Sequence, residues 1–322
     1  MVTSRSHRAR LVTTLLNVTV IALLLSACGL ATGPAPAPSA TAPVYPTGTS
    51  SHRMSFDGAE RTYLIHVPEG LPSTSHELVV MMHGGFGSAL QAEKSYNWDA
   101  AADEGGFIVA YPDGLGRAWN AGECCGKSAR NKVDDVGFIE AMVSEISAGL
   151  DIAENRIFAT GISNGGIMAY RLACETDTFA AIAPVAATML VPCDNPSPIS
   201  VLHIHGLQDT SVPYDGSVGT GAETIDGPPV DDVLAFWRGI DGCGRVVTTA
   251  AGDPRVQDTY PVAECTRFTT VESITIADAG HQWPGAKSSE LRDNLGGVPP
   301  STLLDATSTI AGFFAGHPRP MK

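Results

Sequence analysis

Short apolar runs rich in β-branched residues recur along most of the chain, and segments with helical spacing lie between them. Such runs are typical of strands that are buried on both faces of a sheet. The predicted strands cover residues 62–67, 78–82, 107–111, 157–160, 180–184, 200–205 and 273–276. Because strands and helices alternate, we predict an α/β fold with a mostly parallel central sheet.

Apolar positions three and four residues apart mark the helices of this pattern. In the segment 134–150, Val136, Ile139, Val143 and Ile146 lie on one predicted helix face. Further helices are predicted over residues 230–240 and 303–314, and over the segment that begins at residue 167. Helices between parallel strands pack on both faces of the sheet, so we expect this layered arrangement without a large cap domain.

The first 51 residues have a different composition and are expected to lie outside the folded domain. Three arginines precede an uncharged apolar run that ends in Leu-Ser-Ala-Cys28. This pattern predicts a signal peptide over residues 1–27 and, by its likeness to a bacterial lipobox, lipidation at Cys28. An ordinary secretory signal is the alternative, and the run is short for a membrane span. Residues 28–51 are rich in Pro, Ala and Ser, which predicts a tether before one domain over 52–322.

The charge of the chain limits its partners. Its formal net charge is -14, and removal of the three arginines with the signal peptide leaves −17. A chain this acidic is a poor partner for nucleic acid. We therefore expect a neutral or nearly neutral substrate, and contact with a membrane only through the lipid anchor at the outer face of the bacterial cell membrane.

Six cysteines remain beyond Cys28, and an even number in an exported chain indicates disulfides. They are Cys124, Cys125, Cys174, Cys193, Cys243 and Cys265. Proximity favours Cys174 with Cys193 and Cys243 with Cys265. The adjacent cysteines at 124 and 125 either form a vicinal bridge or stay reduced. Their spacing does not match that of zinc ligands, so we expect no metal.

A candidate nucleophile follows the predicted strand 157–160. The segment Gly161-Ile-Ser163-Asn-Gly165 lies between this strand and the helical segment that begins at Ile167. Glycines two positions before and after a serine allow the sharp strand-to-helix turn of a nucleophile elbow. A glycine-rich turn without chemistry is the alternative, but the flanking strand and helix favour Ser163 as nucleophile.

Acid and base candidates follow in the order expected after such an elbow. Asp209 lies in a turn just after the strand 200–205, and His281 lies in a Gly- and Pro-bounded loop after the strand 273–276. A turn-forming role for Asp209 and a surface or core role for His281 are the alternatives, and Asp215 is a rival acid. We predict that His281 is the base and that Asp209 orients it.

An oxyanion hole requires backbone N–H groups aimed at the developing negative charge. Asn164, directly after the nucleophile, supplies one amide. The segment His83-Gly-Gly85-Phe86 follows the strand 78–82 and supplies the other. Gly85 is the first choice and Phe86 the alternative, whereas His83 is expected to fix the loop. A glycine-rich turn without a ligand is the other interpretation.

Four residues are candidates for substrate contacts. Phe86, Trp119 and Trp283 lie in segments that should converge near Ser163, where aromatic faces hold acyl groups. Plain packing is an equal alternative for each of them. Asp135, beside Asp134, is expected to shape the same pocket, and the alternative is an acidic residue at a helix start.

The chain resembles the polyhydroxybutyrate depolymerase and feruloyl esterase family of α/β-hydrolases over nearly the whole domain, and in particular its mycobacterial-type lipoproteins. The motifs that carry this resemblance are His83-Gly-Gly-Phe-Gly-Ser88, Tyr111-Pro-Asp-Gly114, Trp119-Asn-Ala-Gly122 with Cys124-Cys-Gly126, Asp134-Asp-Val-Gly-Phe138, the elbow at Ser163, His205-Gly-x-x-Asp209 with Val212-Pro-Tyr214, and Gly280-His-Gln-Trp-Pro-Gly285. The resemblance implies hydrolysis of esters of hydroxyalkanoates, feruloylated sugars or acetylated xylan, without metal or organic cofactor.

We therefore expect a serine ester hydrolase that acts on a small-molecule or oligomeric ester. An additional adsorption or carbohydrate-binding domain, common in enzymes that attack solid polymers, is not found, which favours short soluble esters or oligomers. Two other functions stay open. One is transfer of the acyl group to a cell-envelope sugar, and the other is a catalytically idle lipoprotein that binds ligands at the cell surface.

Overall fold

The computed structural model describes residues 43–71, 73–221, 223–266, 268–287 and 299–320. The chain divides into two units, Met1–Thr41 and Ala42–Lys322. The predicted signal peptide, 1–27, and the predicted lipidation site, Cys28, lie outside the described residues. In the described ranges, no helix has both the length and the apolar character needed to cross a membrane.

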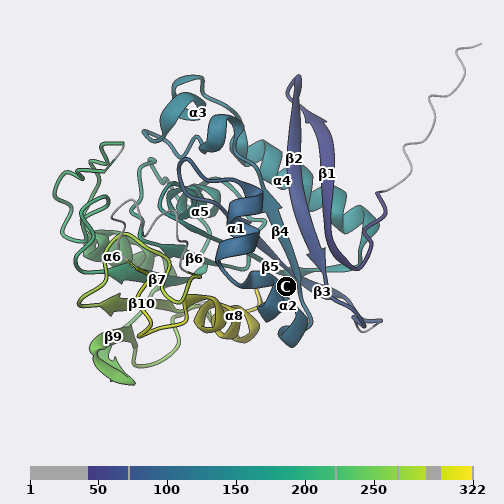
Figure 1. Cartoon of the computed structure of the whole chain (residues 1–322). Coiled ribbons are helices and arrows are strands. Elements are labelled where there is room, and N and C mark those ends of the chain that lie inside the picture. Colours follow the sequence, from purple (N-terminus) through teal and green to yellow (C-terminus); the bar gives the residue numbers. More distant parts are fainter. Residues whose placement is uncertain (1–42, 72, 222, 267, 288–298, 321–322) are drawn as a thin grey trace, which may run out of the picture. The chain divides into compact units, whose positions relative to one another are not determined.

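A mixed sheet forms the centre of the second unit (Figure 1). Its described strands are β1 (Gly48–Phe56), β2 (Ala59–Val67), β3 (His76–Met82), β4 (Ile108–Pro112), β5 (Ile152–Ile162), β6 (Ala181–Val185), β7 (Ser200–Gly206), β8 (Val246–Ala251), β9 (Asp253–Pro261) and β10 (Val271–Ile276). Their order is β1-β2-β4-β3-β5-β6-β7-β10-β9-β8. The strands from β4 to β10 in this order pair in parallel, and the two strands at each edge pair antiparallel. The predicted mostly parallel sheet is confirmed.

Helices cover both faces of the sheet, as the sequence pattern predicts (Figure 1). The described helices are α1 (Ala89–Ser95), α2 (Trp98–Gly105), the 3₁₀ turn η1 (Leu115–Arg117), α3 (Gly126–Arg130), α4 (Asp135–Gly149), α5 (Asn164–Glu175), α6 (Val230–Asp241) and α8 (Ala306–Gly316). In β3, Val80 and Met82 belong to the core that contains α4, α5 and α6, whereas Val79 and Met81 belong to the core that contains α1, α2 and α8. Alternate residues of one strand thus fill two cores, which explains its continuous apolar run.

The folded unit begins earlier than the sequence pattern predicts. Residues 48–51, expected to end the tether, are the start of β1, which pairs with β2 from Gly48 opposite Val67 to Phe56 opposite Ala59. Before it, Tyr45 is buried and its hydroxyl lies 2.9 Å from that of Tyr63. Strand β1 is polar because it lies at the sheet edge and leaves alternate residues exposed, so its composition resembles that of a tether.

Three disulfides link the described cysteines. The bonds Cys174–Cys193 and Cys243–Cys265 follow the pairing that proximity favours. Each closes a loop of about twenty residues, so each restricts the unfolded chain more than the folded one. Cys124 and Cys125 are bonded to each other, which selects the vicinal bridge over free thiols.

Candidate active site

Ser163 occupies the turn between β5 and α5. Its backbone has φ 55° and ψ −124°, a left-handed conformation that a non-glycine residue adopts only under constraint. A Cβ at Gly161 would lie 2.6 Å from a backbone atom of Gly165, and one at Gly165 would lie 2.4 Å from the carbonyl oxygen of Met82. The glycines on both sides of Ser163 are therefore required by close backbone contacts, as the elbow interpretation predicts.

Asp209 and His281 lie in the loops that follow β7 and β10, and their side chains contact each other. The Oδ2 atom of Asp209 lies 2.7 Å from Nδ1 of His281. Its other oxygen, Oδ1, accepts hydrogen bonds of 2.8 Å from the backbone N–H groups of Ser211 and Val212. The carboxylate can only accept, so His281 carries its proton on Nδ1 and presents the lone pair of Nε2. This is the tautomer that a general base needs.

The carboxyl group of Asp209 is buried, yet it is held ionised. Burial alone raises its pKa, but hydrogen bonds from His205, His281 and the Val212 amide outweigh burial and move the pKa below its ordinary value. The rival Asp215 is exposed, and its Oδ1 accepts hydrogen bonds from the backbone N–H and hydroxyl of Ser217.

Ser163 and His281 both line two cavities, which also share Gly85 and Phe86. The Ile225 cavity has a volume of about 240 Å³, and its apolar walls include Phe86, Val212 and Ile225. The Gln91 cavity has a volume of about 400 Å³ and includes Gln91, Ser95 and Tyr96. A substrate bound across Ser163 can therefore place a group in each cavity.

Two backbone amides near Ser163 are candidates for an oxyanion hole. Gly85 lines both cavities, and its N–H donates to no described residue. Asn164 begins α5, so its N–H has no partner within the helix. The alternative donor is occupied, because the N–H of Phe86 donates to the carbonyl oxygen of Arg117 at 2.8 Å. This geometry favours Gly85 over Phe86 as the second amide.

The side chain of Asn164 fixes this amide to a neighbouring loop. Its Oδ1 accepts from the backbone N–H of Trp119 at 2.7 Å, and its Nδ2 donates to the carbonyl oxygen of Trp119 at 3.0 Å. The indole N–H of Trp119 in turn donates to the carbonyl oxygen of His83 at 2.9 Å. Trp119 is fully buried. It therefore joins the elbow to the loop that contains Gly85, which differs from the expected contact with substrate.

His83 stabilises the other end of this arrangement. Its Nδ1 donates to the carbonyl oxygen of Gly84 at 2.7 Å, and its Nε2 accepts from the N–H of Gly114 at 3.0 Å. Burial lowers the pKa of His83, which keeps the ring neutral, as these two hydrogen bonds require. His83 fixes the turn, as expected from the sequence.

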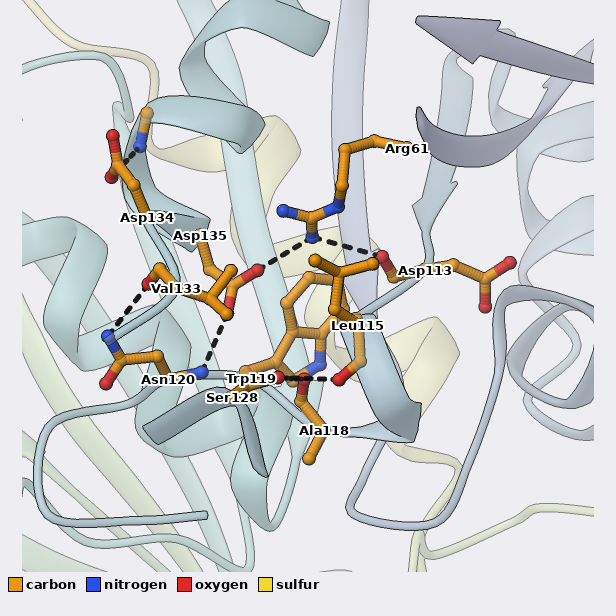
Figure 2. A network of polar contacts seen from close by, with 12 residues as sticks. Arg61, Asp113, Leu115, Ala118, Trp119, Asn120, Ser128, Val133, Asp134 and Asp135 are labelled. Atoms are coloured by element: carbon orange, nitrogen blue, oxygen red, sulfur yellow. Dashed lines mark hydrogen bonds and ion pairs between the residues drawn. The ribbon is translucent and has the colours of Figure 1, made fainter. Parts of the chain in front are cut away.

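Arg61 and Asp135 form a fully buried ion pair next to the segment that contains Trp119 and Asn120 (Figure 2). Asp135 accepts from Arg61 at 2.7 Å through Oδ1 and from the N–H of Asn120 at 2.7 Å through Oδ2. Arg61 also donates to the carbonyl oxygen of Asp113 and lies over the ring of Phe138. Asp135, expected to shape the pocket, is instead enclosed in the interior, where it positions the chain next to Trp119.

The remaining candidate substrate contacts are divided between surface and interior. Phe86 is 58% exposed and lines both cavities, so it remains a candidate. Trp283 is buried, stacks on Tyr96 and donates from its indole N–H to the hydroxyl of Thr307 at 3.0 Å. It anchors the loop of His281 against α8. Trp283 is therefore a packing residue, which differs from the expected contact with substrate.

Comparison with known proteins places this arrangement in a family. NocK of Nocardia uniformis subsp. tsuyamanensis, a protein named as an esterase, is 32% identical over 284 residues that cover 78% of this chain and 83% of NocK. A protein of Aspergillus terreus named as feruloyl esterase C is 31% identical over 264 residues, which cover 76% of this chain and 89% of that protein. The chain belongs to this feruloyl esterase-like family.

Members of this family are carboxylic ester hydrolases, and this chain is one of them. Residues 94–193 also match the model of the prolyl oligopeptidase family. The acetyl xylan esterase from Aspergillus awamori aligns with a TM-score of 0.56 at 16% identity, covering 77% of this chain and 98% of that one. This likeness shows the α/β-hydrolase fold.

This esterase has site residues that sequence reasoning missed. The guanidinium of Arg117 donates to the carbonyl oxygens of Phe86 and Gly87. The Phe86 N–H also donates to the carbonyl oxygen of Arg117, and these three hydrogen bonds together fix the loop that contains Gly85. Glu223 and Ile225 line the Ile225 cavity from a loop after β7. Spacing along the chain contains no signal for such contacts, because they join segments that meet only in the folded state.

Proposed function

We propose that the esterase acts through Ser163, His281 and Asp209 and forms an acyl-enzyme on Ser163. The observation that supports this most directly is the 2.7 Å contact between Asp209 and His281 in a site whose cavities both include Ser163. Two amides without partners in the described residues, those of Gly85 and Asn164, lie beside the serine. These are the parts that acyl transfer to a serine hydroxyl needs.

In the proposed reaction, Ser163 Oγ attacks the ester carbonyl carbon while His281 Nε2 takes its proton. The carbonyl oxygen becomes an oxyanion that accepts hydrogen bonds from the two amides. Collapse expels the alcohol, which receives the proton from His281, and leaves the acyl group on Ser163. Water then attacks this ester and loses a proton to His281, and His281 returns that proton to Ser163 Oγ as the acid is released.

The cavities support a short or aromatic acyl group. The Ile225 cavity is narrow and mostly apolar, with Phe86 exposed at one wall, which suits an acetyl, hydroxyalkanoyl or feruloyl group. The Gln91 cavity has polar side chains at Gln91 and Ser95, which suit the hydroxyl groups of a sugar or oligomer alcohol. The relatives named as feruloyl esterases support the aromatic acyl group.

A substrate panel tests the proposal. Hydrolysis of p-nitrophenyl acetate, butyrate and octanoate, methyl ferulate and a hydroxybutyrate oligomer is measured with the wild type, Ser163→Ala and Ser147→Ala. Ser147 lies on α4 and donates only to the carbonyl oxygen of Val143, so it is a matched control. We expect Ser163→Ala alone to lose activity and labelling by a fluorophosphonate. Retained labelling in Ser163→Ala would refute the proposed nucleophile.

Hydrolysis and acyl transfer are separated by the products. When an acceptor sugar is supplied, free acid must accumulate if water is the acceptor, whereas a new ester would indicate transfer to the envelope. The same panel excludes an idle binding protein, because such a protein would hydrolyse none of the esters.

We also propose export with a lipid anchor at Cys28. The support is the arginine-led apolar segment before Leu-Ser-Ala-Cys28 in the sequence. In cell fractions of the native host, Cys28→Ala should shift the protein from the membrane to the soluble fraction. Continued retention on membranes by Cys28→Ala would contradict the anchor without affecting the proposed chemistry.

A further inference from the structure

Three buried polar side chains, those of Tyr170, His203 and His205, form a row of hydrogen bonds that ends at the loop containing Asp209 and Val212, and they transfer no proton in the reaction proposed above. The hydroxyl of Tyr170 lies 2.8 Å from Nδ1 of His203. Nε2 of His203 lies 2.9 Å from Nδ1 of His205, and Nε2 of His205 lies 2.8 Å from the carbonyl oxygen of Val212. Each of the three side chains is at most 1% exposed.

The carbonyl oxygen of Val212, at the end of this row of hydrogen bonds, determines which ring nitrogens carry hydrogen. The oxygen of Val212 can only accept, so His205 donates from Nε2, and the tautomer of the ring with this single hydrogen leaves a lone pair on Nδ1. That lone pair accepts from Nε2 of His203, whose own Nδ1 then accepts from the hydroxyl of Tyr170. Burial lowers the pKa of His203, so the ring is neutral and supplies a single proton.

This row of hydrogen bonds connects α5, which follows Ser163, to the loop that contains Asp209 and Val212. Tyr170 lies on α5, the helix that begins directly after Ser163. His203 and His205 lie two residues apart on β7, so they occupy the same face of the sheet. Val212 lines the Ile225 cavity and donates its N–H to Asp209. The ring atom Nε2 of His205 also lies 3.5 Å from Oδ2 of Asp209.

We propose that Tyr170, His203 and His205 are positioning residues that hold the loop of Asp209 and Val212 in its reactive geometry. This inference rests on the proposed triad. The carbonyl oxygen of Val212 sets the tautomer of His205, His205 sets that of His203, and the hydroxyl of Tyr170 holds His203 by donating to its Nδ1. In this tautomer Nε2–H of His205 donates to the carbonyl oxygen of Val212, so the loop that orients His281 is held from its buried side.

The opposite tautomers would disrupt the site. In the opposite tautomers His203 carries its hydrogen on Nδ1, donates to the hydroxyl oxygen of Tyr170, and accepts at Nε2 from Nδ1 of His205. The lone pair of His205 Nε2 would then face the carbonyl oxygen of Val212 and the carboxylate of Asp209. These contacts are repulsive in a buried environment, so the loop would move and His281 would lose its orientation.

Variants of Tyr170 and His203 test this role through kcat. Tyr170→Phe removes only the hydroxyl, and His203→Leu removes both nitrogen atoms. We expect kcat on p-nitrophenyl acetate to fall by roughly 3- to 10-fold, the scale of one buried hydrogen bond, with little change in KM. In His203→Gln the amide oxygen accepts from Tyr170 and the amide nitrogen donates to His205, so kcat should recover to within about two-fold.

A matched control separates positioning from stability. Tyr63 is also a fully buried tyrosine, and its hydroxyl donates to Glu145 at 2.7 Å, away from both cavities. Tyr63→Phe and Tyr170→Phe should both lower the thermal midpoint, but only Tyr170→Phe should lower kcat. Equal kcat values for His203→Leu and His203→Gln, or a wild-type kcat for Tyr170→Phe, would overturn the proposal.

The tautomers are measured directly by ¹⁵N NMR of the histidine rings in the wild-type protein. We expect both His203 and His205 to carry hydrogen on Nε2, whatever the substrate of the enzyme. A proton on Nδ1 of either ring would refute the proposed positioning role even if the triad is correct. Retained activity in Ser163→Ala would instead refute the triad and leave the ring tautomers as they are.

Discussion

Oδ2 of Asp209 lies 2.7 Å from Nδ1 of His281, although 72 positions separate the two residues in the chain. The contact depends on a glycine, because a Cβ at Gly206 would lie 2.3 Å from the carbonyl oxygen of Ala279. The loops after β7 and β10 can approach this closely only where one of them has no side chain. The parallel pairing of β7 and β10 brings the two loops to the same end of the sheet.

Asp209→Asn should lower kcat by about 10³- to 10⁴-fold, the scale of the same change in serine proteases. The amide of Asn donates to Nδ1 of His281, so the proton moves to Nε2 and the base is lost. The measurement is kcat on p-nitrophenyl acetate, with Asp215→Asn as the control because Asp215 is exposed and contacts Ser217. Similar losses in the two variants would contradict the assignment of Asp209.

Arg117→Ala should lower kcat by about ten-fold, because the loop that contains Gly85 loses its clamp while the amides themselves remain. Steady-state kinetics should show the loss in kcat more than in KM. Arg255→Ala is the control, since Arg255 pairs with Asp253 and Asp278 at the surface. If Arg117→Ala raises KM alone, Arg117 contacts the substrate and does not hold the loop.

Asp135→Asn should destabilise the fold by about 3 kcal/mol, because Arg61 would keep a buried charge without its partner. The double variant Arg61→Met with Asp135→Asn should cost less than the sum of the single changes. Urea unfolding measures both quantities. KM should stay near the wild-type value in Asp135→Asn, and a large rise in KM with unchanged stability would restore the substrate role that the sequence suggests.

Asp241→Asn should change how stability depends on pH. Burial raises the pKa of Asp241 to about 7, well above the value near 3.9 of an unfolded chain. The folded state therefore binds the proton more tightly, and this stabilisation is lost as pH rises from about 4 through 7. Relative to the wild type, Asp241→Asn should gain about 2 kcal/mol between pH 5 and pH 8.

Unfolding by urea at pH 5, 6, 7 and 8 measures this gain, with the exposed Asp226→Asn as control. A constant difference in unfolding free energy between Asp241→Asn and the wild type at all four values would show that Asp241 is ionised throughout.

The central strands and the elbow were predictable because each is set by local pattern. Strand β3 is apolar on both faces, and the glycines around Ser163 mark a turn that few other residues permit. Strands β1, β8 and β9 were not predicted. They lie at or next to the edges of the sheet and most of their residues are not buried, so they lack the continuous apolar runs that mark the central strands.

The candidate site was likewise predictable only in part. The order of Ser163, Asp209 and His281 follows from the fold class, whereas the roles of Trp119, Asp135 and Trp283 depend on which loop packs over which. Sequence places all three near the strand ends but does not say whether a side chain points toward the cavity or into the core. Burial beneath neighbouring loops decides this, and it involves contacts far apart in the chain.

The two cavities that share Ser163 and His281 have a consequence for the second half of the reaction. In the proposed reaction, with the acyl group in the Ile225 cavity and the alcohol in the Gln91 cavity, the acyl group stays on Ser163 when the alcohol leaves, and the next nucleophile enters through the Gln91 cavity. Whatever fills that space competes with water for the acyl group. The ratio of free acid to exchanged ester is then set by how strongly Gln91 and Ser95 retain an incoming hydroxyl compound, and a change confined to that wall would alter the ratio without altering the first step.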